Sequence, residues 1–325
     1  MSRTEKGRQV GLVLLSATAA AVLQMTAIGS LLFTLPLLLI DRRHPKATTD
    51  TACVAALVLI LARYVFLYRD SLGQVLTWAF IGVNMFMPLS LVLCAMAWVG
   101  KGGEGSVSTR LLKGFVPTLI LAALLLAALA FVPGMLDAVV GAYMDSARFV
   151  LNLFMVGMAE STVDMMATVI VFAMATLVLP LILAAHLVAT FMYEAATHPQ
   201  DPIFEMKVDS FRLPGWFLHL FLALWALVLL SCLVTLSFWL VVPVLSLAMC
   251  SLVLYFVQGF AVISWRLHAR GGRMSSGKLA VMLFLILLLV QVVNAVLFLI
   301  IALLGVLENW IDFRKPKEFS HEDHS

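Results

Sequence analysis

Charged residues are scarce in this sequence. Only 12% of its 325 residues are Asp, Glu, Lys or Arg, while 63% are hydrophobic, and the mean hydropathy is +1.06. A soluble domain has about one quarter charged residues, so this chain lacks the polar surface it would need to cover itself in water. The composition excludes an ordinary soluble domain. The formal net charge of +3 is too small to indicate a nucleic-acid partner.

Cysteines and catalytic motifs are also scarce. The four cysteines lie inside apolar runs without C-x-x-C spacing, which favours small core residues over a disulfide or a metal site. We therefore expect no metal and no cofactor. The chain has no G-x-x-x-x-G-K-[ST], H-E-x-x-H, G-x-S-x-G or G-x-G-x-x-G motif. These absences argue against a self-contained ATP-driven motor, a metalloprotease of that signature and a dinucleotide enzyme, but they leave other kinds of enzyme open.

Long apolar runs fill most of the chain. A helix that spans the hydrocarbon core of a bilayer needs about 20 apolar residues. The runs here are continuous and rich in Leu, Ala, Val and Met, whereas a membrane β-barrel shows short alternating segments. The sequence predicts an all-α, polytopic transmembrane helix bundle of roughly eight or nine membrane segments, with residues 1–325 forming a single integral membrane domain in contact with lipid. The central runs are about Thr51–Leu67, Val75–Val99, Phe115–Phe131, Val163–Glu194, Trp216–Leu240 and Leu245–Leu267, with a turn expected near Pro243.

The first apolar stretch, from Gly11 to Ile40, is interrupted by Gly29 and Pro36 and has basic residues on both flanks. Basic flanks favour the cytoplasm. We therefore expect a broken N-terminal helical pair whose two ends lie on the cytoplasmic side, although a single tilted helix is an alternative.

Two further segments differ from the apolar runs. Residues 135–162 carry acidic residues among apolar ones, which predicts an interfacial helix segment on the outer face. Residues 315–325 are predicted to be a flexible tail. The run from Leu279 to Leu307 leaves the side of the C-terminus open, because the sequence fits either one helix or a pair of short ones.

Polar residues inside apolar runs are costly in lipid and therefore mark candidate ligand-binding positions. His186 lies within a long apolar run. Glu160 and Asp164 are four residues apart, so they share one helix face and together suit a cation. Gln258 and Asn84 are amides in the middle of their runs. Each has a structural alternative: a hydrogen bond between helices for His186 and the amides, and an acidic helix start for the carboxylates.

The first helix has a surface of small residues. Ser16, Ala17, Ala20 and Ala21 form a small-x-x-x-small pattern. Small side chains let two helix backbones approach closely. The pattern predicts a contact between helices, either within this protein or with a partner subunit.

Three stretches resemble a known family. They are Phe211–Trp216 (FRLPGW), Phe256–Ser264 (FVQGFAVIS) and Leu304–Arg314 (LGVLENWIDFR). Together and in this order they are similar to the YybS-like family, a domain of unknown function in bacterial inner-membrane proteins. The positions that carry the resemblance include Pro214, Gly259, Trp310, Asp312 and Arg314.

This resemblance implies a multi-pass protein of the bacterial cytoplasmic membrane, and it brings no established activity. The family is distantly similar to the substrate-binding subunits of energy-coupling-factor transporters. Those subunits bind vitamins or metal ions within a helix bundle and dock on a membrane partner through small residues of the first helix. The surface from Ser16 to Ala21 matches that role. A structural reading of the C-terminus makes Trp310 an interface anchor and has Asp312 and Arg314 tie the tail to a loop.

Three functions remain in competition. The first is a solute-binding or transport-associated subunit without its own ATPase, for which other membrane subunits are candidate partners. The second is a membrane scaffold or assembly factor. The third is an intramembrane enzyme acting on a lipid or isoprenoid substrate, with His186, Glu160 and Asp164 as its candidate residues. The first is favoured, and no catalytic residue is assigned.

Overall fold

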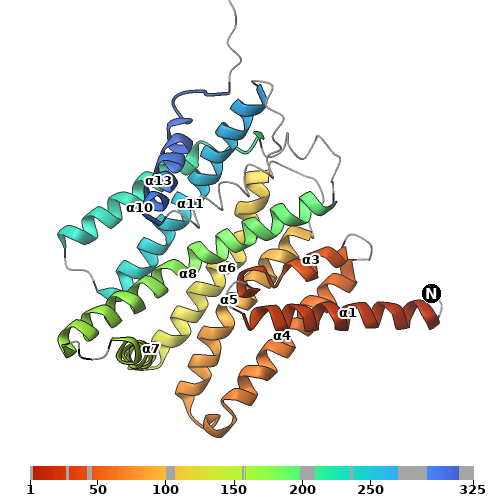
Figure 1. Cartoon of the computed structure of the whole chain (residues 1–325), viewed down its shortest axis with the longest axis vertical. Helices are drawn as coiled ribbons and strands as arrows, with labels where there is room; N and C mark the ends of the chain where they lie inside the picture. The colour runs from red at the N-terminus through yellow and green to blue at the C-terminus, as the bar shows by residue number, and fades with distance from the viewer. Residues whose placement is uncertain are drawn as a thin grey trace, which may run out of the picture.

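The computed structural model describes residues 3–26, 29–41, 46–99, 107–155, 157, 159–197, 209–234, 237–269 and 291–314. Within these ranges every regular element is a helix (Figure 1). They are α1 (Arg3–Gln24), α2 (Gly29–Leu32), α3 (Leu35–Asp41), α4 (Lys46–Leu67), η1 (Arg69–Ser71), α5 (Val75–Val99), α6 (Val107–Phe131), α7 (Met135–Phe154), α8 (Glu160–Thr197), α10 (Trp216–Leu233), α11 (Phe238–Ala269) and α13 (Gln291–Leu307).

Six of the described helices are long and apolar enough to cross a membrane: α4, α5, α6, α8, α10 and α11. Three shorter apolar helices accompany them, at Gln9–Gln24, Gly29–Ile40 and Asn294–Leu307. This is the architecture of a helical membrane protein. The predicted count of eight or nine membrane segments is not confirmed. Part of the last predicted run, like the predicted tail at 315–325, lies outside the described residues.

The predicted break in the first apolar stretch is confirmed. Helix α1 ends at Gln24, α2 begins at Gly29, and α3 begins at Leu35, one residue before Pro36. Proline is tolerated in the first turn of a helix, where its missing N–H has no partner to lose. A side chain at Gly29 would start 2.3 Å from Thr26 Oγ1. Because α3 contacts α1, the chain folds back on itself as a short pair.

The predicted turn near Pro243 is wrong. Helix α10 ends at Leu233 and α11 begins at Phe238, so the turn lies earlier and Pro243 lies within α11. The apolar run continues through the turn, and hydropathy alone gives no sign of it. A proline so close to the start of a helix removes few backbone hydrogen bonds.

Helix α7 occupies most of the predicted interfacial segment 135–162. It begins after Gly134 and ends before Gly157, and both glycines have positive φ angles, of 75° and 90°. Such angles are accessible mainly to glycine. Figure 1 shows α7 nearly end-on while α8 lies in the plane of view, so the two helices cross steeply. Phe149 and Phe154 of α7 are exposed, and the interfacial position of this segment, like its side of the membrane, stays a prediction.

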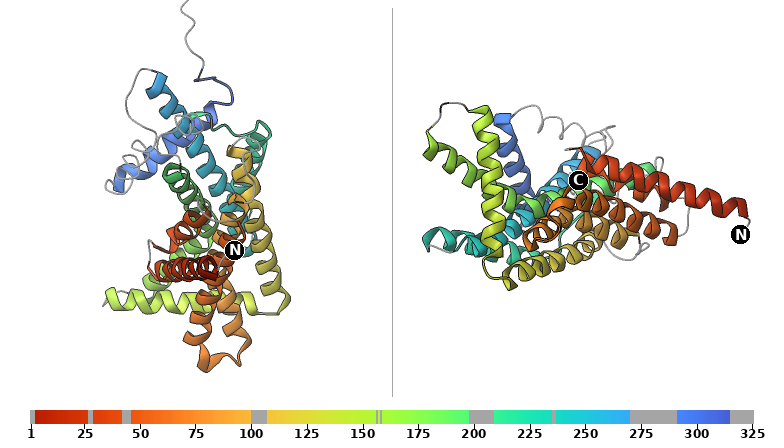
Figure 2. Two further views of the ribbon diagram at one scale, coloured as in Figure 1. Left: turned by 90° about the vertical axis from the view of Figure 1, so that its right-hand side faces the viewer. Right: turned by 90° about the horizontal axis from the view of Figure 1, so that it is seen from below.

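Helix α8 joins the two halves of the molecule. It contacts α2, α3 and α5 of the N-terminal half and α11 of the C-terminal half. The right-hand view in Figure 2 shows the N-terminal part of α1 extending beyond the other helices. Because α8 touches both halves, its buried residues are well placed to form a site between them.

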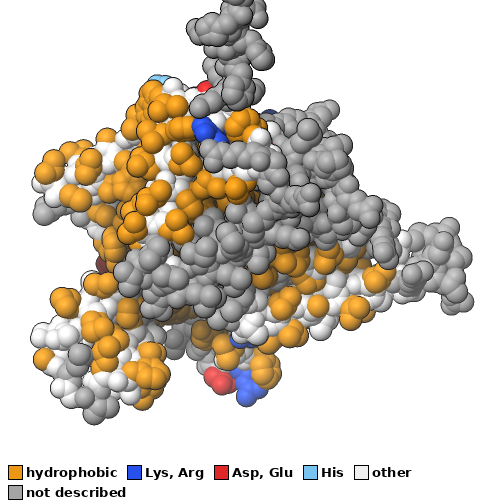
Figure 3. All heavy atoms as spheres, turned by 45° about the horizontal axis from the view of Figure 1, so that its top comes forward, with side chains coloured by type: hydrophobic (Ala, Val, Ile, Leu, Met, Phe, Trp, Pro, Cys, Tyr) orange, Lys and Arg blue, Asp and Glu red, His pale blue; other side chains and the backbone are white. Residues whose placement is uncertain are grey.

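The surface of the described residues is mainly apolar. Figure 3 shows apolar side chains over much of the described part of one face, with charged side chains in small patches. On α10, Leu229 and Leu233 are 65% and 84% exposed. A soluble monomer rarely exposes apolar surface on this scale, whereas hydrocarbon solvates it without penalty.

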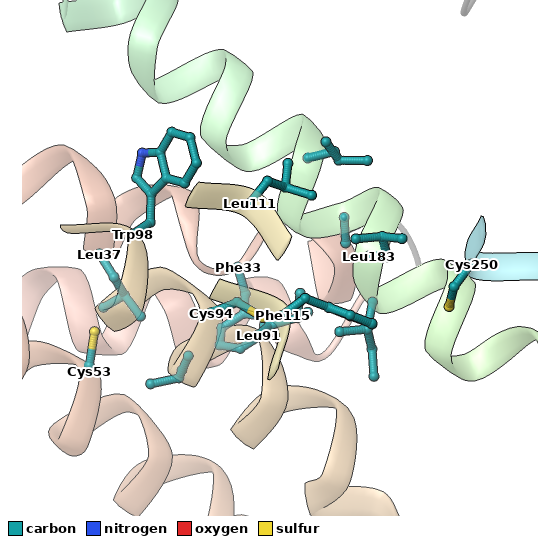
Figure 4. Packing of buried hydrophobic residues seen from close by; sticks show 14 of the residues in the cluster. Phe33, Leu37, Cys53, Leu91, Cys94, Trp98, Leu111, Phe115, Leu183 and Cys250 are labelled. Carbon is teal, nitrogen blue, oxygen red and sulfur yellow. The ribbon is translucent and has the colours of Figure 1, made fainter. Parts of the chain in front are cut away.

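The largest buried cluster among the described residues joins residues from α1 to α13. It includes Phe33, Leu37, Leu91, Phe115 and Leu183 (Figure 4). In the same view Trp98 lies at the edge of the cluster, with its indole nitrogen turned away from Leu91 and Phe115. The polar atom of Trp98 therefore faces out of the apolar core.

Candidate functional site

The structure brings the three stretches that carry the family resemblance together at one end of α11 and α13. We refer to this region as the C-terminal junction, and it comprises Asp209–Pro214, Gln258–Gly259, Gly305–Glu308 and Arg314. Its centre is Gln258, which is fully buried. The Gln258 side chain accepts a hydrogen bond from the Leu213 N–H (2.9 Å) and donates one to the Gly305 carbonyl (3.0 Å). One amide therefore joins all three stretches.

Gly259 and Gly305 let the backbones of α11 and α13 touch at this junction. An ideal Cβ on Gly259 would lie 1.8 Å from the Ile301 carbonyl oxygen, and one on Gly305 would lie 2.0 Å from the Tyr255 carbonyl oxygen. No real side chain fits at such distances. The two glycines are therefore required by the helix contact.

Arg314 closes the junction from the C-terminal side. Its guanidinium pairs with the fully buried carboxylate of Glu308, with Nε 2.6 Å from Oε1 and Nη2 2.9 Å from Oε2. It also donates to the carbonyls of Asp209 and, at 2.8 Å, Phe211. Burial raises the pKa of the Glu308 carboxyl, and the Arg314 guanidinium works against that rise. A bidentate pair of this kind fixes geometry as well as charge.

We predict that Gln258→Leu destabilises the protein by about 1–3 kcal/mol, because it leaves the buried Leu213 N–H and Gly305 carbonyl without their side-chain partner. Reversible unfolding in mixed detergent micelles measures the change. The matched control is Ser251→Ala, since the buried Ser251 hydroxyl donates, among the described residues, to the carbonyl of Ala248 in its own helix, at 2.6 Å. Equal losses for the two variants would contradict a bridging role for Gln258.

His186 has a different environment, near the crossing of α5, α6 and α8. His186 is 1% exposed, and its Nε2 atom has no hydrogen-bond partner among the described residues. Trp98 meets the imidazole edge to face, with ring centroids 6.0 Å apart. An ideal Cβ on Gly114 would lie 3.6 Å from Nε2, so the backbone of α6 passes close to this nitrogen.

Arg110 also contacts Trp98. Its guanidinium carbon lies 4.2 Å from the centroid of the indole, and Nη2 donates to the Trp98 carbonyl at 2.6 Å. The Arg110 Nε and Trp98 Nε1 atoms are buried and have no hydrogen-bond partner among the described residues. We call Trp98, Arg110, Gly114 and His186 the His186 site. Three unpartnered nitrogens in one cluster are unusual, because buried polar groups are almost always hydrogen-bonded.

The two predicted carboxylates do not form a pair for a cation. Asp164 Oδ1 lies 2.7 Å from Arg148 Nε, and the same guanidinium contacts Asp145 at 3.0 Å. Glu160 is the exposed first residue of α8. Arg148 therefore neutralises Asp164, which leaves little charge for a ligand. Glu160 in the first turn of α8 matches the acidic helix start that is the structural alternative for these carboxylates.

The small-residue surface of the first helix is buried within the chain. Ser16, Ala17, Ala20 and Ala21 are at most 8% exposed, and the three alanines belong to the same cluster as Ala52 and Ala56 of α4. The close helix contact that the pattern predicts is thus made with α4. Docking of a separate subunit on these four residues would require α4 to move away.

The other residues that carry the family resemblance lie in different surroundings. Arg314 ties the end of the described chain to the loop before α10, as the structural reading predicts, and Asp312 only accepts a 3.4 Å bond from the Arg314 N–H. Trp310 is 62% exposed, as suits an interface anchor. Pro214 precedes α10, and its carbonyl accepts from the Phe217 N–H at 2.9 Å.

Sequence reasoning missed Glu308, Trp98 and Arg110. Glu308 lies directly after an apolar run, within the stretch Leu304–Arg314. A carboxylate six residues before an arginine in that stretch was a signal for an ion pair. Trp98 and Arg110 lie at the ends of two helices on either side of a glycine-rich loop. Their pairing depends on how α5 and α6 dock, which no local pattern reveals.

Comparison with protein-family models, with curated proteins and with solved structures found no match in any of the three. The class of protein follows from the fold alone: a multi-pass helical membrane protein.

Proposed function

We propose that this membrane protein binds a small solute at the His186 site, as a transport-associated subunit that relies on separate ATPases. The observation that carries the proposal is the buried His186 Nε2 without a hydrogen-bond partner among the described residues. Leaving such a group unpaired costs about 1–3 kcal/mol. A ligand that bonds to this nitrogen removes the cost.

The location of the site supports this proposal. Trp98 of α5 and Gly114 of α6 lie beside His186 of α8, so a ligand held against His186 lies between helices of the bundle. Small-molecule sites form preferentially between the helices of bundles. The chain has no phosphate-binding loop of its own, which is why we assign ATP hydrolysis to partners. The YybS-like resemblance supports a bacterial inner-membrane location as part of the same proposal.

The test is extraction from native membranes into polymer-bounded nanodiscs, followed by native mass spectrometry. We expect a small molecule bound to the wild-type protein, and an occupancy lowered about tenfold or more in His186→Leu, since one hydrogen bond to a buried polar group is worth about 1.4 kcal/mol.

The matched control is Thr176→Val, also buried in α8, because Thr176 bonds only to the carbonyls of Phe172 and Ala173 within its own helix. Its occupancy should equal that of the wild type. If neither a small molecule nor an ATPase ever accompanies the intact protein, the proposal is wrong.

A membrane scaffold or assembly factor is the second candidate. It is favoured by one observation: Gln258, Asn84 and Asp164 all use their polar atoms within the chain. A scaffold needs such a closed interior and no ligand. Recovery of a stoichiometric membrane protein in the same nanodiscs, without a small molecule, would favour this candidate.

The candidate catalytic residues of an intramembrane enzyme, His186 and Asp164, lie too far apart to act together. His186 lies 22 residues after Asp164 on the same helix, which corresponds to about 33 Å at a rise of 1.5 Å per residue. General acid–base partners act within direct hydrogen-bond reach of one substrate. These residues therefore do not act together on one bond.

A further inference from the structure

We infer that the ligand of the His186 site carries an anionic oxygen group, a carboxylate or a phosphate, held by Arg110 and the indole N–H of Trp98. This inference rests on the proposed function and adds the chemical class of the ligand. It depends on the cation and the donors around Trp98, whereas the proposed function depends on His186.

The charge of Arg110 is the first reason. A guanidinium remains protonated in proteins, and no ion pair between described residues includes Arg110. Its two contacts, the face of Trp98 and the Trp98 carbonyl, leave the positive charge without an anion. By contrast, Arg148 and Arg314 each have a carboxylate within 3.0 Å. A charge that is part-buried and unpaired favours a ligand of opposite sign.

The unused nitrogens are the second reason. Arg110 Nε and Trp98 Nε1 can only donate hydrogen bonds, and both are buried without a partner among the described residues. A cation with its own unused N–H, next to a second unused donor on Trp98, matches an acceptor with several oxygens. His186 Nε2 adds a third polar contact, as donor or acceptor according to its tautomer. A cationic ligand fits this arrangement poorly.

The position of Arg110 is the third reason. It lies in the first turn of α6, which begins at Val107. The positive end of the helix dipole at that terminus adds to the attraction for an anion. The contact of Arg110 with the last turn of α5 holds the guanidinium beside Trp98, so the donors are positioned before the ligand arrives.

The test uses purified protein in nanodiscs with two anionic probes. One arm compares phosphatidylcholine discs with discs that also contain phosphatidylglycerol, and native mass spectrometry counts the anionic lipids retained. The other arm adds inorganic phosphate to phosphatidylcholine discs and measures the melting temperature and the retained anion. Retention in the first arm identifies a lipid headgroup as the source of the anion, and retention in the second identifies a free solute.

The variants are Arg110→Gln, which removes the charge, and Trp98→Phe, which keeps an aromatic face and removes the N–H. We expect retention to fall about tenfold or more in the first and about threefold in the second, since a hydrogen bond to a charged group is worth about 1.5–3 kcal/mol and a neutral one less. Arg266→Gln is the control, because the one hydrogen bond that Arg266 donates within the described ranges goes to the Phe313 carbonyl. If Arg110→Gln does not fold, the retention of the anionic probe by Trp98→Phe decides whether the inference holds.

The outcomes separate this inference from the proposed function. If wild-type protein from native membranes carries a neutral or cationic solute, or an anion that both variants retain fully, the inference fails while the proposed function stands. If neither probe is retained by the wild type and no native ligand is found, both fail. If only phosphatidylglycerol is retained, the anion site stands and the role in solute transport fails.

Discussion

Replacing Gly259 by alanine destabilises the protein by about 3 kcal/mol or more, because the new Cβ meets the backbone of α13. Its ideal position is 1.8 Å from the Ile301 carbonyl oxygen. Overpacking against side chains costs typically about 1–3 kcal/mol, and here the obstacle is a main chain that cannot change rotamer. The helices must separate, which also lengthens the Gln258–Gly305 hydrogen bond. Reversible unfolding in mixed detergent micelles measures the loss.

Gly141→Ala is the control for Gly259→Ala. Gly141 lies within α7, and an ideal Cβ there meets nothing within 4 Å. The same added methyl group should stabilise α7 by about 0.5–1 kcal/mol through helix propensity. If the two alanine variants are equally stable, α11 and α13 do not touch at Gly259, and the backbone contact described for the C-terminal junction is wrong.

Replacing Glu308 by glutamine produces the second large effect, a loss of about 3 kcal/mol. The change leaves the Arg314 guanidinium, whose side chain is 14% exposed, without its charge partner. Removing one member of a buried pair costs about 3–5 kcal/mol, much of it the penalty of an uncompensated charge. The C-terminal segment should detach from the loop before α10, which limited proteolysis near Arg314 detects alongside unfolding in micelles.

The double variant Glu308→Gln with Arg314→Met tests the origin of that loss. Because it removes both charges, it should be more stable than Glu308→Gln alone. Asp70→Asn is the matched control. Its pair with Arg69 is exposed, with side chains 63% and 93% accessible, so no measurable change is expected. Additive losses in the double variant would show that Glu308 and Arg314 are not coupled.

Several features of the fold were predictable because they depend on local composition. The apolar runs predicted helices, and Gly29 with Pro36 predicted the break after α1, since both residues act on the backbone where they stand. The turn before α11 was misplaced at Pro243, because a proline early in a helix and a proline in a turn look alike in sequence. The number of spans depends on helix ends that hydropathy does not mark.

The candidate sites were less predictable. His186 stood out as a polar residue in an apolar run, but so did Gln258 and Asn84, and only contacts between helices distinguish them. Among the described residues, Gln258 bonds to two backbone groups, Asn84 bonds to the Phe80 carbonyl and to the Tyr143 side chain of α7, and His186 Nε2 has no partner. By sequence alone, the carboxylates of Glu160 and Asp164 suit a cation. In the structure, Arg148 of the preceding helix α7 lies beside Asp164 and neutralises its charge.

The sequence by itself determined that this chain needs a membrane, because a chain with so few charges has no other suitable solvent. It also determined that helices fill that membrane, since each run is long and continuous. Only the tertiary structure decided which polar groups are free. It paired Glu308 with Arg314 and left His186, Trp98 and Arg110 each with a nitrogen that has no hydrogen-bond partner in the described part of the chain. Hydrogen bonding between helices depends on docking, and docking is a property of the whole fold.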